Sequence, residues 1–333
     1  MVHSNDLGRQ HAINGGVTAC IDESGASTKI ILHALAIADA LGLHSTLLHV
    51  LETGQAQGAR PDPLEWELRR RDAHAMLQKF ADKCRDSNHQ VSMELVEGRT
   101  DDQICRWVQD HSAALIALGT NGESDFREHS LGNTARHVIS RASGSVLLVP
   151  PSTDDAHAVT YQRIMVPVDG SSRAESVLQL AALIAKGHKA EIFLVHVVPT
   201  PELTEIGPIE AEDIEMREQI TARNERVAIE YLDRMKKQLT QDGVKSRGLV
   251  IRERDVRSCL ANFIVEQKID LVVLSAQGRS GRHDVSHGSV ATHLMTHASV
   301  PMLIVQSDYV QPASKRAATA EQAGIRLPGQ IMS

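Results

Sequence analysis

The chain alternates short apolar runs with longer segments whose apolar residues recur every three or four positions. The short runs are typical of buried strands, and the periodic segments are typical of amphipathic helices. In the first half we expect strands at Val17–Ile21, His44–Leu51, Gln90–Val96, Ala113–Leu118 and Val146–Val149. The helices expected between them include Leu64–Asp86, Asp101–His111 and Thr134–Arg141. The order βαβαβαβαβ predicts a parallel sheet covered by helices on both faces.

Polar residues mark where these elements begin and end. Asp22 follows the first expected strand, and Ser24 and Ser27 are candidate caps for the helix that follows. Pro61 and Pro63 are expected to keep the next helix from starting before about Leu64.

The second half of the chain repeats the first. Asp169 ends the run Arg163–Val168 as Asp22 ends its own run, 147 residues earlier (169 − 22). Gly132 and Gly288 are 156 residues apart (288 − 132), so the second half holds nine extra residues between these points. Such a constant offset indicates an internal structural repeat.

We therefore expect two tandem doubly wound α/β domains, each with a five-stranded, mainly parallel sheet and helices on both faces. The domains are expected at 15–152 and 161–308, joined by a polar linker at 153–160. Polar, unpatterned residues 1–14 predict a flexible leader, and residues 309–333 a disordered tail. In such sheets a ligand binds at the carboxyl ends of the strands, where the strand order reverses.

Composition argues against several classes of protein. A net charge of −7 gives no basic field for nucleic acid, and no apolar run approaches the length of a membrane span. The chain starts without the features of a secretory signal, and its four cysteines are scattered, which favours a reducing compartment. We expect a cytoplasmic protein with no nucleic-acid or membrane partner.

A glycine-rich loop follows the fourth expected strand of each half. Glycine admits positive φ and lets backbone N–H groups approach a ligand, and the start of the next helix favours an anion such as phosphate. In the first half the loop and helix start comprise Gly119, Gly122, Gly132, Asn133 and Thr134. The matching residues of the second half are Ser275, Gly278, Gly288, Ser289 and Val290.

The spacing G-2x-G-9x-G, followed by Ser, Thr or Asn, resembles the nucleotide loop of the universal stress protein family, and with the repeat it resembles a tandem member. The resemblance implies an adenine-nucleotide alpha hydrolase-like fold that holds ATP, with or without Mg²⁺, or else AMP or ADP. It also implies that Asp22 and Asp169 meet the adenine side and that Val50 and Val197 pack on the base. The loop residues would contact phosphate and ribose.

Two positions depart from the family pattern. Ser275 replaces the first glycine, which requires an ordinary φ or a side chain that points away from the ligand. Cys20 stands where the family usually has proline; it reads as a small core residue, with a redox-sensitive thiol as the alternative. We favour the first half slightly for nucleotide, with both halves occupied as an open option.

The resemblance implies a nucleotide-responsive regulatory factor in stress response and no efficient enzyme. The loops contain no P-loop lysine pattern, so we assign no catalytic or metal-binding residues. The alternatives are a nucleotide-free scaffold and a slow ATPase. The halves are expected to pack as an internal pseudo-dimer through Val146–Val149 and Pro301–Val305. An unidentified protein partner and further homo-oligomerisation stay open.

Overall fold

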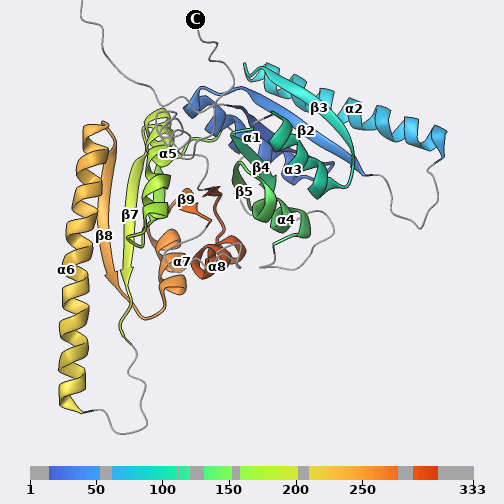
Figure 1. The fold of residues 1–333 in the computed structure, drawn as a ribbon. Helices are drawn as coiled ribbons and strands as arrows, with labels where there is room; N and C mark the ends of the chain where they lie inside the picture. The colour runs from blue at the N-terminus through green and yellow to red at the C-terminus, as the bar shows by residue number, and fades with distance from the viewer. Residues whose placement is uncertain are drawn as a thin grey trace, which may run out of the picture.

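A computed structural model describes residues 15–52, 62–111, 113–120, 131–151, 158–201, 210–276 and 288–306 (Figure 1). The expectations for the leader at 1–14, the tail at 309–333 and most of the linker lie outside these residues.

The described residues form two βαβαβαβαβ runs, as the sequence predicts. The strands of the first run are β1 (Val17–Cys20), β2 (Ser45–Glu52), β3 (Val91–Gly98), β4 (Leu115–Gly119) and β5 (Ser145–Val149). Those of the second are β6 (Arg163–Pro167), β7 (Glu191–Val198), β8 (Lys245–Arg252), β9 (Leu271–Ser275) and β10 (Met302–Val305). The helices are α1 (Ala26–Leu41), α2 (Pro63–Asp86), α3 (Thr100–His111), α4 (Asn133–Arg141), α5 (Ser172–His188), α6 (Ala211–Gln241), α7 (Val256–Glu266) and α8 (Ser289–His297).

All ten strands join in one sheet, in the order β3-β2-β1-β4-β5-β10-β9-β6-β7-β8. Strands within each half are parallel, and each half is a doubly wound unit of five strands. One apolar core lies between the sheet and α1, α2, α5 and α6, and the other lies between the sheet and α3, α4, α7 and α8. Helices therefore cover both faces, which confirms the predicted fold class.

The two halves meet at an antiparallel ladder between β5 and β10. Leu147 lies opposite Leu303, and Met302 lies opposite Leu148. These four side chains are almost completely buried. The sequence predicted contact through the last strand of each half, and the ladder joins those strands, so both cores continue from one half into the other.

One helix starts within one residue of its expected position, although Pro63 belongs to it, and the serine caps expected for another helix were wrong. Helix α2 begins at Pro63, one residue after Asp62, whose side chain accepts hydrogen bonds from the N–H groups of Leu64 and Glu65. Proline suits the first helical position because the N–H it lacks would be unpaired there anyway. Helix α1 has Gly25 at its N-cap and no side-chain cap, so Ser24 and Ser27 have another role.

A second contact between the halves lies on one face of the sheet, where α1 packs against α5. The buried side chains of His33 and Tyr161 meet there, with 2.8 Å between His33 Nδ1 and the Tyr161 hydroxyl oxygen. The Tyr161 ring also meets the ring of His188 edge to face, and His188 Nε2 lies 3.1 Å from the Ala36 carbonyl oxygen. These contacts were not predicted, since the His33–Tyr161 and Ala36–His188 pairs join residues more than a hundred positions apart.

Burial lowers the pKa of His188 below its ordinary value of 6.5, against smaller opposing effects of the Ala36 carbonyl and Asp39. The unfolded chain therefore binds the proton more readily, and we expect the free energy of unfolding to fall as the pH drops through about 6.5. Replacing His188 by glutamine should reduce this pH dependence. Urea denaturation at several pH values measures it, with exposed His74→Gln as control; equal pH dependence in both variants would contradict the prediction.

Candidate functional site

The candidate crevice of each half lies where the strand order reverses. In the first half this point is between β1 and β4, because the chain leaves β1 toward β2 on one side and β4 toward β5 on the other. Asp22 lies two residues beyond the end of β1, and Gly119 is the last residue of β4. The topology therefore brings these two predicted site residues to the same edge of the sheet.

Two serines hold the carboxylate of Asp22. Its Oδ1 atom accepts hydrogen bonds from the backbone N–H of Ser24, at 3.0 Å, and from the hydroxyl of Ser27, at 2.9 Å. Ser27 is fully buried, and its oxygen also lies 2.9 Å from the Asp22 backbone nitrogen. The second oxygen, Oδ2, makes no hydrogen bond with a residue that the structure describes.

The second half builds the corresponding turn differently. Asp169 Oδ1 accepts a hydrogen bond from the backbone N–H of Ser171, at 3.0 Å. The intervening Gly170 has φ of +78°, a left-handed conformation that glycine adopts at little cost. Glu23 stands at the matching position in the first half, so the two equivalent aspartates, Asp22 and Asp169, lie on turns of different conformation.

A histidine on the second strand of each half ties that strand to the site, a role that sequence reasoning missed. His49 Nδ1 lies 2.8 Å from the carbonyl oxygen of Ile21, directly before Asp22. His196 Nδ1 lies 2.7 Å from the carbonyl oxygen of Val168, directly before Asp169. The signal was available, because these histidines precede Val50 and Val197 in the repeated tripeptides LHV and VHV.

The glycines before α4 and α8 close the loop in the same way in both halves. The Gly132 N–H donates to the Thr120 carbonyl over 2.8 Å, and the Gly288 N–H donates to the Ala276 carbonyl over 3.1 Å. Among the described residues, no side chain caps the start of either helix, which leaves its first N–H groups without a side-chain acceptor there. The φ angles of Gly132 and Gly288 are −58° and −69°, so the positive φ expected of the loop does not occur at these two residues.

The strand register explains how a serine replaces glycine in the second half. Gly119 pairs with Val149 at the end of β4, and Ser275 pairs with Val305 at the end of β9. Ser275 therefore has extended backbone, which any residue can adopt, and the first of the two conditions set for it is met.

The remaining predicted site residues differ in exposure. Val50 and Val197 are 9% and 7% exposed and belong to the core on the α3, α4, α7 and α8 side. At the helix starts, Asn133 and Ser289 are exposed, whereas Thr134 and Val290 are half-buried. Gly122 and Gly278 lie outside the described residues, as do the arginines of both loops, Arg127, Arg279 and Arg282.

A family model decides what this repeated architecture is. The universal stress protein family matches twice, at residues 16–150 and at residues 160–306. The chain belongs to the universal stress protein family. Two matches in one chain make it a tandem member, as the sequence predicted.

Known relatives match this chain over most of its length or over about one half of it. One from Mycolicibacterium smegmatis is 24% identical over 309 residues, covering 89% of this chain and 99% of its own. MJ0531 of Methanocaldococcus jannaschii is 30% identical over 150 residues, or 44% of this chain and 82% of its own. The crystal structure of a universal stress protein from Archaeoglobus fulgidus has a TM-score of 0.65 at 16% identity and covers 88% of this chain and 99% of its own, which shows the fold.

The two domains of this universal stress protein differ in charge beside the helix that follows the glycine loop. In the first, His137 Nδ1 of α4 lies 2.9 Å from Oδ2 of Asp101, a buried acid at the start of α3. In the second, the residues 156 positions further on are His293 and Arg257. There burial, the neighbouring His297 and the Arg257 guanidinium lower the pKa of His293. The acid beside this helix in the first domain is therefore replaced by a cation in the second, where Asp255 partly opposes its effect on His293.

The thiol of Cys20 is not activated. Burial raises its pKa far above the ordinary range, with a smaller contribution from Cys105, so the reactive thiolate form is suppressed. This supports the core interpretation over a redox-sensitive thiol.

No group of three or more His, Cys, Asp or Glu side chains placed to hold a metal occurs among the described residues. The helices of the described ranges are all too short or too polar to span a bilayer.

Proposed function

We propose that this chain binds an adenine nucleotide, ATP foremost, in the crevices formed at the carboxyl ends of its strands. One observation carries the proposal. In both domains a helix without a side-chain cap begins at the carboxyl end of the sheet, where a glycine N–H donates a hydrogen bond to a carbonyl just after the fourth strand. An aspartate whose carboxylate accepts hydrogen bonds from its own turn lies at the same end of the sheet. A helix start favours phosphate through its free N–H groups and its dipole. Mg²⁺ would accompany the phosphates.

Different described residues would contact the phosphate, the ribose and the base of such a ligand. The N–H groups at the start of α4 receive phosphate, and the free Oδ2 of Asp22 accepts a hydrogen bond from the base or ribose. Val50 offers its remaining apolar surface to the base. In the second domain the start of α8 would bind phosphate, Val197 would contact the base, and the carboxylate of Asp169 would lie beside the base or ribose.

Nucleotide occupancy supplies a regulatory mechanism. A ligand that binds one arrangement of the loop more tightly shifts the population toward it, and a partner protein that contacts the loop then detects the change. In this proposal the protein is a nucleotide-responsive factor in stress response, and its output is an interaction and not a chemical product.

Calorimetric titration of ATP with Mg²⁺ into the full chain tests the proposal. Asp22→Asn keeps an acceptor for Ser24 and Ser27 but replaces Oδ2 by an NH₂ group, and Asp169→Asn makes the same change in the second domain. Each should weaken binding at its own site about tenfold or more, since a hydrogen bond to a charged group contributes about 1.5–3 kcal/mol.

The exposed Asp82→Asn on α2 serves as the control and should bind as the wild type does. If the wild type takes up no ATP, ADP or AMP, the glycine loops are structural turns and the nucleotide-free scaffold replaces this proposal.

A further inference from the structure

Helix α6 extends beyond the sheet that supports it. Among residues 211–221, the first buried side chain is that of Thr221, at 2% exposed, and residues 211–220 are all exposed except the half-buried Arg217. Figure 1 shows the N-terminal end of α6 projecting past the end of β8. A helical segment of about ten residues is marginal in water without packing, so this end would gain from a partner.

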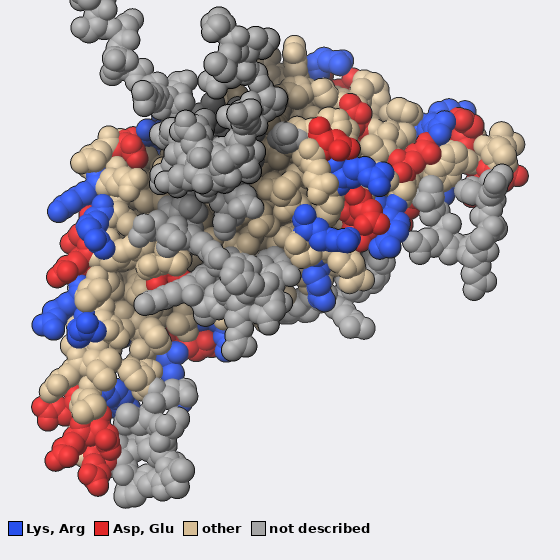
Figure 2. All heavy atoms as spheres, in the orientation of Figure 1, with Lys and Arg blue, Asp and Glu red and all other residues tan. Residues whose placement is uncertain are grey.

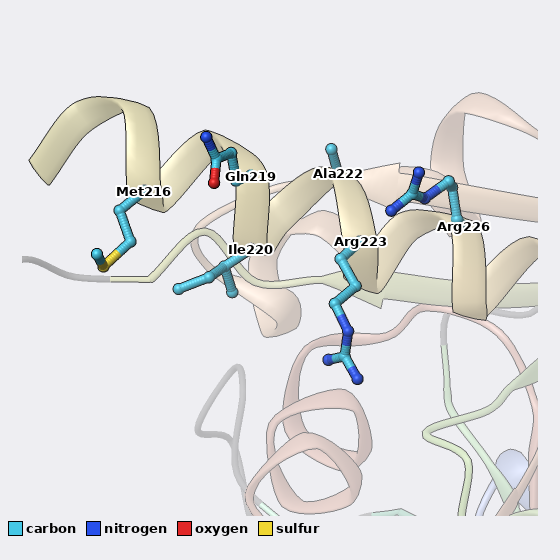
Figure 3. Close-up of a pocket in the computed structure, with 6 residues that line it drawn as sticks. All are labelled: Met216, Gln219, Ile220, Ala222, Arg223 and Arg226. Atoms are coloured by element: carbon cyan, nitrogen blue, oxygen red, sulfur yellow. The ribbon is translucent and has the colours of Figure 1, made fainter. Parts of the chain in front are cut away.

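The projecting part carries an apolar stripe. Met216, Ile220 and Val227 are 63%, 42% and 55% exposed, and their spacing of four and seven residues places them on one side of the helix. Figure 3 shows Met216 and Ile220 directed to the same side as Arg223, along a shallow hollow on α6. The opposite side is occupied, because Glu218 and Glu225 both bind Arg252 of β8. The stripe therefore lies on the side of α6 opposite these ion pairs.

Opposite charges flank this stripe at its two ends. Glu212 and Asp213 lie at the start of the helix, where Figure 2 shows acidic side chains gathered at the lower end of the molecule. Arg223 and Arg226 follow, and neither they nor Glu212 form an ion pair with a residue that the structure describes. Glu212 and Arg226 lie about 20 Å apart along the helix, too far to pair within it.

We propose that a second copy of this chain packs antiparallel on α6 along this stripe. A twofold axis that crosses the helix pair at the level of residue 218 places Met216 of each copy against Ile220 of the other. The same register places Glu212 of each copy beside Arg226 of the other, and Asp213 beside Arg223.

The charge pattern selects this occupant. An acidic start and a basic middle on one helix complement themselves only when the second helix is reversed, which is the condition for an isologous twofold contact. Antiparallel helices then bury the apolar stripe between flanking ion pairs, as in a coiled coil. This contact uses no residue of the β5–β10 ladder and none of the predicted site residues.

Sedimentation velocity of the full chain at about 1 to 100 µM tests the stripe. The wild type should dimerise, and Ile220→Glu should remain monomeric, because it buries two unpaired carboxylates at the centre of the contact. The matched control is Val265→Glu on α7, which changes an apolar residue that is 71% exposed elsewhere; it should dimerise as the wild type does. A monomeric wild type, or an Ile220→Glu dimer, would overturn the proposal.

A charge exchange tests the register. Glu212→Lys and Arg226→Glu should each weaken self-association about tenfold, since each places like charges together at both ends of the contact. Mixing the two variants should restore dimers, because a heterodimer pairs Lys with Glu at one end and Glu with Arg at the other. A mixture that associates no better than either variant alone overturns the antiparallel arrangement. ATP titration of Ile220→Glu separates this test from the nucleotide proposal, since the crevices are unchanged.

Discussion

Replacing Leu147 by alanine is expected to lower the free energy of unfolding by about 2–5 kcal/mol, the usual cost of removing a fully buried leucine side chain. Leu147 is 0% exposed and lies on β5 directly opposite Leu303 of β10, which is also 0% exposed. The substitution opens a cavity at the joint between the two halves, where neighbouring strands on both sides limit relaxation. Urea denaturation followed by circular dichroism measures the change.

The pairing of these two leucines makes a second outcome measurable. Leu303→Ala should cost a similar amount, and the double variant should differ from the sum of the single effects by about 0.5–3 kcal/mol, because the residues share one contact. Leu64→Ala on α2 is the control, since that leucine is 71% exposed and should change stability little. Additive effects of the two buried substitutions would show that the ladder does not couple them.

The same ladder predicts how the chain unfolds. Each of the two cores contains residues of both halves, so neither half keeps its apolar surface buried when the other is lost. We therefore expect one cooperative transition for the whole sheet. Two separate transitions, with Leu147→Ala shifting only the first, would contradict this view of the joint.

The architecture was predictable because it depends on patterns that repeat. The spacing of apolar residues distinguished strands from helices, and the constant offsets between matching residues showed that the chain is duplicated. Together these two patterns predicted the fold of each half. The joint through β5 and β10 was expected from the apolar character of VLLVP and PMLIV and from the resemblance. A doubly wound half leaves its last strand at an edge, and the sheet continues there into the other half.

The details of the site were less accessible, because one residue type suits several roles. Ser27 lies near a helix start, where serine commonly caps, yet its hydroxyl binds back to Asp22. The backbone conformation of the turn between Asp22 and Ser27 decides which of the two roles Ser27 takes. His49 and His196 were visible as a repeated feature, but their bonds to Ile21 and Val168 depend on which strands become neighbours.

Long-range contacts between the halves were not predictable from local pattern. Tyr161 directly follows the expected linker and precedes the first strand of the second domain, yet it is 1% exposed and packs between helices α1 and α5. Its environment is set by how the two halves of the sheet join, and no periodicity within either half contains that information.

Gly187 is the tightest point of that contact, and replacing it by valine is expected to destabilise the chain by about 1–3 kcal/mol. A Cβ atom at this position would lie 2.6 Å from both the Cα and the Cβ of Ala40, so α1 and α5 must move apart. The movement would also strain the neighbouring contact of His188 with the Ala36 carbonyl. Thermal unfolding monitored by circular dichroism measures the loss.

Lys186→Val provides the matched control, because it introduces the same side chain at the preceding position of α5, where the lysine is exposed. Valine is a better helix former than glycine, so helix propensity alone predicts that Gly187→Val stabilises α5. The two explanations therefore differ in sign. A drop in stability for Gly187→Val that is absent from Lys186→Val locates the cost at the contact with Ala40, whereas equal stability of both variants would show that α1 and α5 separate freely and that the β5–β10 ladder alone holds the halves together.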